Sequence, residues 1–127
     1  MNFRNKYLVI SLRTLFGLAL IAIGVMGFIF EPPADQLTEK GAAAIAGLEA
    51  LGIAKFISIV EILAGLMLVT GFLPAFGAIL AAPIVVGIIV YHIVQEPSSI
   101  VPGLVFAVLN AYLGYAYWDK YKAIFKR

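Results

Sequence analysis

Residues 56–71 read FISIVEILAGLMLVTG, an apolar run in which Glu61 is the only charged residue. A run of this kind predicts a helix that crosses most of the hydrocarbon core of a bilayer. A carboxylate near the middle of such a helix costs about 2.5–3.5 kcal/mol even on the most lenient scale, so it should face protein or water and have a partner. The rest of the chain is therefore expected to supply a polar interior around Glu61.

The composition places the whole chain in a membrane. It has 127 residues, of which 63% are hydrophobic and only 13% charged, and its mean hydropathy is +1.04. Soluble domains average about 25% charged residues. The absence of cysteine excludes disulfides and thiolate-bound metals, and one histidine is too few for an ordinary zinc site. A net charge of +2 gives no reason to expect a nucleic-acid partner.

Four stretches are long and apolar enough to be spanning helices. They predict one domain over residues 1–127, of the all-α class: an integral membrane four-helix bundle. Pro74 and Pro102 suit the first turn of a helix, where the missing N–H would be unpaired anyway. The expected spans are residues 7–30, 54–71, 74–95 and 101–118.

The loop between the first two spans is the only long one. Pro32 and Pro33 should end the first helix, and residues 38–51 predict a short amphipathic helix on the outer face. A plain ordered loop is the alternative. Basic residues precede the first span and follow the fourth, whereas this loop is rich in acids. The positive-inside rule therefore predicts that both termini lie in the cytoplasm.

Small residues favour close helix packing in membranes, and they mark the inward face of each span. At 100° per residue, the strongly polar side chain of each span falls on that same face. The first span contributes Arg13, the second Glu61, the third His92 and the fourth Asn110. These four are the candidate ligand-binding residues.

Each candidate also has a plainer interpretation. Arg13 is placed to pair with Glu61, but it could instead pair with Asp119 or extend to the inner interface. Glu61 could contact a ligand, handle a proton or form a structural ion pair. His92 could bond a quinone carbonyl or a lipid head group, cap its helix or bond Glu96. Asn110 is best explained as a hydrogen bond between helices.

Several motifs resemble the DoxX family of small bacterial and archaeal membrane proteins, over nearly the whole chain. The first span contains Leu12-Arg13 and ends in FIFEPP (residues 28–33). The second contains VEILAGLML (60–68), similar to the family's Glu-x-x-x-Gly-x-x-Leu pattern. The most specific parts are YHIVQEPSSI (91–100) and VLNAYLGYAYWDKY (108–121).

One departure matters. Many members have Asn-Lys before the end of the first helix, where this chain has Val25-Met26-Gly27. Any role of that lysine is absent here. The resemblance implies a four-helix protein of the prokaryotic inner membrane, and some members are named for a thiosulfate:quinone oxidoreductase. It carries over no set of catalytic residues.

The functional expectation is an accessory or ligand-binding subunit of a membrane redox system, holding a quinone or a lipid. The alternatives are a small transporter or proton pathway, an oxidoreductase acting alone, and a purely structural subunit. The second of these is weak because the chain lacks cysteine, paired haem ligands and a dinucleotide fingerprint. No cofactor other than quinone is suggested. The expected partners are the bilayer, a membrane or cytoplasmic redox protein, and, as an open question, further copies of the chain.

Overall fold

The computed structural model describes residues 4–29 and 37–125, and in this part of the chain all regular structure is helical. Three helices are long and apolar enough to cross a membrane: α1 (24 residues), α3 (18) and α4 (21). The apolar helix α5 is shorter, with 16 residues. The elements are α1 Lys6–Ile29, α2 Glu39–Ala50, α3 Ile53–Thr70, α4 Pro74–Val94, η2 Pro97–Ser99, α5 Val101–Ala116, α6 Trp118–Tyr121 and η3 Lys122–Phe125.

The predicted helix bounds agree with these to within two residues. The largest difference is at the end of the fourth predicted span, which stops at Ala116 because the chain turns at Tyr117 before α6 begins. The predicted helix over residues 38–51 is confirmed as α2. The predicted break at Pro32-Pro33 lies outside the described residues.

Local signals explain three of the boundaries. The Oγ1 atom of Thr38 accepts a hydrogen bond from the backbone N–H of Gly41 at 3.0 Å, and this caps the first turn of α2. At the C-terminal end of α3, Gly71 adopts a left-handed φ of 77°, which glycine reaches without steric cost. Pro74 then occupies the first turn of α4, as its sequence position predicts.

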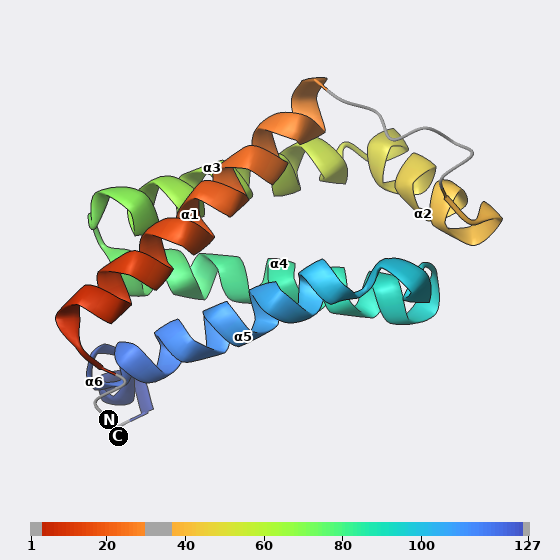
Figure 1. Ribbon diagram of the computed structural model, residues 1–127. Helices are drawn as coiled ribbons and strands as arrows, with labels where there is room; N and C mark the ends of the chain where they lie inside the picture. Colours follow the sequence, from red (N-terminus) through yellow and green to blue (C-terminus); the bar gives the residue numbers. More distant parts are fainter. Residues whose placement is uncertain (1–3, 30–36, 126–127) are drawn as a thin grey trace.

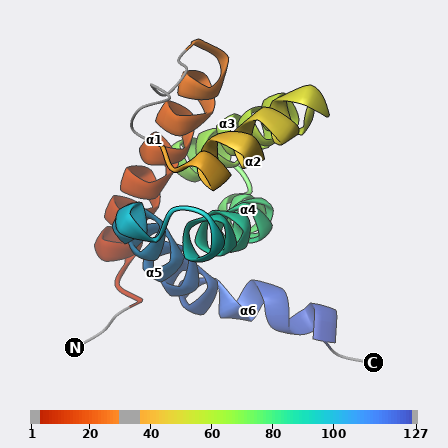
Figure 2. The same ribbon diagram turned by 90° about the vertical axis from the view of Figure 1, so that its right-hand side faces the viewer.

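Helix α1 runs along α3 and α4 runs along α5, and the two pairs meet where α3 packs on α4 (Figure 1). The pairs lie close together at the end of the molecule that carries the termini and α6. They diverge towards the opposite end, where α2 lies across the opening (Figure 2). We call these the terminal end and the α2 end of the molecule.

Glycines bring the backbones of α1 and α3 into contact. A Cβ atom added to Gly65 would lie 2.6 Å from the carbonyl oxygen of Gly17, so neither position has room for a side chain. The predicted inward faces of the first three spans are confirmed by burial, at Gly17, Leu20 and Gly24, at Ser58, Gly65 and Leu68, and at Ala78, Ala81 and Val85.

The prediction for the inward face of α5 is only half right. Gly103 is buried, but nothing lies within 4 Å of a Cβ placed on Gly114, and the neighbouring Leu113 fills the core instead. Large apolar side chains cover the outside of the helices; Val86, Val101 and Val108 are each more than 60% exposed. Together with the three long apolar helices, this surface suggests a membrane protein.

Candidate ligand-binding cavity

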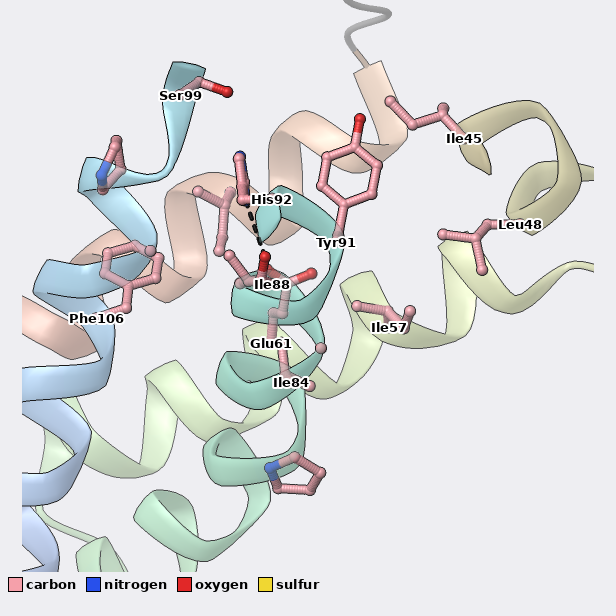
Figure 3. A pocket seen from close by; sticks show the side chains of 15 residues that line it. Ile45, Leu48, Ile57, Glu61, Ile84, Ile88, Tyr91, His92, Ser99 and Phe106 are labelled. Atoms are coloured by element: carbon pink, nitrogen blue, oxygen red, sulfur yellow. Dashed lines mark hydrogen bonds between the residues drawn. The ribbon is translucent and has the colours of Figure 1, made fainter. Parts of the chain in front are cut away.

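A cavity of about 880 Å³ lies where the two helix pairs diverge, below α2 (Figure 3). Its wall is almost entirely apolar, with side chains from all of the helices α1 to α5. Ligand sites in proteins are commonly concave, mostly apolar and supplied with a few polar groups. The lining residues are Ile23, Ile45, Leu48, Ile57, Glu61, Pro83, Ile84, Gly87, Ile88, Tyr91, His92, Ser99, Pro102, Gly103 and Phe106.

Glu61 is the acidic residue of this wall. It lies on α3, only 7% of it is exposed, and its carboxyl group points towards the turn of α4 that carries Ile88 and His92 (Figure 3). None of the described residues forms a hydrogen bond or an ion pair with its carboxyl group. An unpaired buried carboxyl group costs stability, and Glu61 makes no polar contact in the described structure that would account for its place in the fold.

His92 lies across the cavity on α4. Its Nδ1 atom is 2.8 Å from the carbonyl oxygen of Ile88, one turn earlier in the same helix. A carbonyl oxygen only accepts hydrogen bonds, so Nδ1 must carry the proton. The predicted alternative, a bond between the side chains of His92 and Glu96, does not form in the described structure: the Glu96 carboxylate is engaged by Thr38, and the two residues are joined only by a backbone bond, from the Glu96 N–H to the His92 carbonyl oxygen at 3.2 Å.

Tyr91 is a polar residue of the cavity that the sequence did not single out. Its hydroxyl group is buried, and no described residue bonds to it. The Tyr91 ring meets the ring of His92 edge to face, with centroids 5.1 Å apart. The aromatic-histidine pair in YHIVQEPSSI was the available signal, although only the histidine was proposed as a ligand residue.

The expected Arg13–Glu61 ion pair is wrong for the described structure. The Arg13 guanidinium donates instead to the Tyr117 hydroxyl at 3.2 Å, and it lies beside Gly71 at the end of α3. Glu61 is ten residues earlier on α3, or about 15 Å along the helix axis. The helix rotations were predicted correctly, but the axial register between α1 and α3 keeps the two charges apart.

The alternative partner for Arg13 is also occupied. Asp119 forms ion pairs with Arg4 at 2.8 Å and with Lys122 at 3.3 Å. The hydrogen bond from Arg4 is the main reason why the pKa of Asp119 lies below its usual value, and Lys122 adds to the effect. This cluster belongs to the terminal end, far along the helices from the cavity.

Asn110 also lies away from the cavity. Its Nδ2 atom donates to the carbonyl oxygen of Ala78 at 3.1 Å, and this bond joins α5 to α4. The interpretation of Asn110 as a bond between helices is therefore confirmed. Of the four candidate residues, the structure brings Glu61 and His92 together in one cavity and places Arg13 and Asn110 elsewhere.

Glu96 explains why α2 covers the cavity. It is 4% exposed, and it accepts hydrogen bonds from the backbone N–H of Thr38 at 2.5 Å and from its hydroxyl at 2.9 Å. The same hydroxyl is 2.7 Å from the carbonyl oxygen of Gln95. These contacts tie the start of α2 to the turn after α4, and so hold Ile45 and Leu48 against the opening.

No family model, no curated protein and no solved structure matches the chain. The resemblance to the DoxX family therefore depends on the motifs quoted above. Among the described residues, no group of three or more histidine, cysteine, aspartate or glutamate side chains could hold a metal ion.

Proposed function

We propose that this chain is an integral membrane protein that binds a hydrophobic ligand, of the quinone or lipid kind, in the cavity around Glu61. In this proposal α1, α3, α4 and α5 form a four-helix bundle across the inner membrane of a prokaryotic cell. Arg4, Lys6, Lys120 and Lys122 at the terminal end support a cytoplasmic location of both termini. The motifs shared with the DoxX family support a role beside a membrane redox partner.

The observation that carries the proposal is the contrast between the cavity wall and Glu61. An apolar cavity of 880 Å³ has room for a ring with a chain attached, and an amphiphile of this kind would keep its tail in the apolar part. Its head group could then meet the carboxyl group that has no partner in the described structure. Ionisable groups inside a membrane are costly and are commonly functional.

A proton pathway through the protein is less well supported. It would need polar groups that lead from Glu61 to the terminal end. Between Glu61 and the terminal end, α1 and α3 are instead in close apolar contact in the described structure. The backbones of Gly17 and Gly65 touch there, and Leu68 is fully buried.

Filling the cavity tests the proposal. Gly87 lines the wall and has nothing within 4 Å of an added Cβ atom, so Gly87→Trp can place an indole in the cavity. Gly114→Trp is the matched control, because Gly114 also has open space but lies outside the cavity. Binding of decylubiquinone and of its reduced form to protein in lipid nanodiscs would be measured for wild type and both variants.

We expect Gly87→Trp to weaken binding at least tenfold while Gly114→Trp binds as wild type does. Thermal unfolding of each variant checks that the fold is retained. Equal binding by wild type and a folded Gly87→Trp variant would show that the cavity is not the site.

A further inference from the structure

The polar groups of the cavity wall determine whether a ligand must donate or accept hydrogen bonds, and His92 is the first of these groups. Since Nδ1 donates to the Ile88 carbonyl, the neutral ring has a free lone pair on Nε2. No described residue bonds to Nε2, and His92 lines the cavity. In this tautomer the histidine offers the ligand an acceptor and no donor.

Glu61 adds a second acceptor. An ionised carboxylate only accepts hydrogen bonds, and a protonated carboxyl group has one accepting oxygen and one O–H donor. Glu61 and His92 line the same cavity from opposite helices, α3 and α4 (Figure 3). The Tyr91 hydroxyl can donate one bond, and it can equally accept one. His92 Nε2 therefore only accepts a hydrogen bond, whereas Glu61 and Tyr91 can adapt to a ligand that donates to them.

A ligand head group that only accepts hydrogen bonds fits this arrangement poorly. The oxygens of a quinone have no proton to donate to His92 Nε2, so that lone pair would be left without a partner. A hydroxyl head group would donate to this same atom. Buried polar groups left without partners make such sites discriminate strongly between a ligand with a hydroxyl and its analogue without one.

We propose that the cavity selects amphiphiles whose head group donates hydrogen bonds, such as a hydroquinone or an alkylphenol, over those whose head group only accepts them. This inference rests on the proposed function, because it names the class of ligand for the same cavity. Glu61 and His92 Nε2 are the accepting groups. The apolar wall holds the tail whichever head group is present.

The test compares two ligands that differ by two hydrogens. Decylubiquinol and decylubiquinone have the same ring substituents and the same tail, and their dissociation constants would be measured anaerobically in nanodiscs at one pH. We expect the quinol to bind at least tenfold more tightly. Decylphenol forms a third arm, which separates a general preference for hydroxyl groups from recognition of the quinol ring.

The outcomes separate the two proposals. Quinone binding that equals or exceeds quinol binding overturns this inference and leaves the cavity as the ligand site. If none of the three ligands binds, the proposed function itself fails. Glu61→Gln, which adds an amide donor, should reduce the preference for quinol at least threefold, whereas Asp119→Asn makes the same chemical change outside the cavity and should leave it unaltered.

The tautomer provides a second, independent measurement. The chain has a single histidine, so ¹⁵N-histidine labelling gives the two ring-nitrogen signals of His92 without overlap. We expect a protonated Nδ1 and an unprotonated Nε2 in the free protein, and a shift of the Nε2 signal when quinol binds. A proton on Nε2 of the neutral ring would overturn the inference.

Discussion

At the terminal end of the molecule, polar side chains reach across the packing to other helices. Asn110 of α5 bonds the Ala78 carbonyl, and the Tyr121 hydroxyl bonds the Ala75 carbonyl at 2.6 Å. At the α2 end, Glu61 and the Tyr91 hydroxyl face a cavity, and no described residue satisfies them. The polar side chains of the helix interfaces therefore have partners in the chain, whereas these two groups of the cavity wall have none in the described structure. A polar residue in an apolar helix thus has a structural role where the chain itself supplies its partner, as it does for Asn110.

A bulky side chain between α1 and α3 should have the largest effect on the stability of the protein. Gly65→Leu places a side chain against the Gly17 backbone, which cannot move aside as a flexible side chain can. We expect a loss of about 3 kcal/mol or more in the free energy of unfolding, measured by denaturation in detergent. Gly114→Leu enters open space and should be close to wild type; similar losses in both variants would contradict the tight packing of α1 on α3.

Removing the unsatisfied acid should separate stability from binding. Glu61→Leu eliminates a buried carboxyl group that has no partner among the described residues, so we expect the free energy of unfolding to rise by about 1–3 kcal/mol. Ligand binding should be lost in the same variant. A destabilised Glu61→Leu protein would show that the acid has a structural role.

Releasing the start of α2 should have a local effect. Thr38→Val removes the cap on Gly41 and the hydroxyl that bonds Glu96, at a cost of about 1 kcal/mol. Hydrogen exchange should accelerate in α2 and remain unchanged in α1 and α3. Ser11→Ala is the control, because it removes a bond to the carbonyl oxygen of Tyr7 on the same helix and leaves α2 intact.

Asn110→Ala should have a smaller effect. It removes one hydrogen bond between helices, which in membrane proteins is worth about 0.6 kcal/mol on average. Thermal unfolding should register this loss, while ligand affinity stays at the wild-type value because Asn110 does not line the cavity. A loss of affinity without a loss of stability would place Asn110 in the functional part of the molecule.

The smallest effect is expected at Asp119. Its pKa is lowered in the folded protein, mainly by the hydrogen bond from Arg4, so the ionised form stabilises the fold. This contribution is present above the unfolded-state pKa of about 3.9 and is lost as the pH falls through the lower folded value. The unfolding temperature of wild type should therefore fall slightly more than that of Asp119→Asn when the pH is lowered from about 6 to 3. An equal fall would mean that the ion pairs contribute nothing.

The sequence predicted the helices well because apolar length, proline and glycine are local signals. It also predicted which face of α1, α3 and α4 is buried, since small residues such as Gly17 and Gly65 mark close packing. It could not predict how far one helix is shifted along another. That shift, determined by the contact between these two glycines, is what separates Arg13 from Glu61.

The candidate site was predicted only in part, because contacts between distant parts of the chain are not visible in local sequence patterns. Glu61 and His92 stood out as rare polar residues in apolar helices, and the structure does place them in one cavity. The unsatisfied Tyr91 hydroxyl and the tautomer of His92 depend on where neighbouring atoms lie, which no local pattern contains. The role of Glu96 was hidden because its partner Thr38 lies 58 residues away in the sequence.

The bond between Arg13 and Tyr117 has a consequence for biosynthesis. These residues are 104 positions apart, so the guanidinium leaves the ribosome long before the hydroxyl that accepts its hydrogen bond. In the proposed membrane location, Arg13 must be hydrated or held near lipid head groups until α5 has been inserted. Chains truncated before Tyr117 would keep this charge without the hydroxyl group that accepts its hydrogen bond.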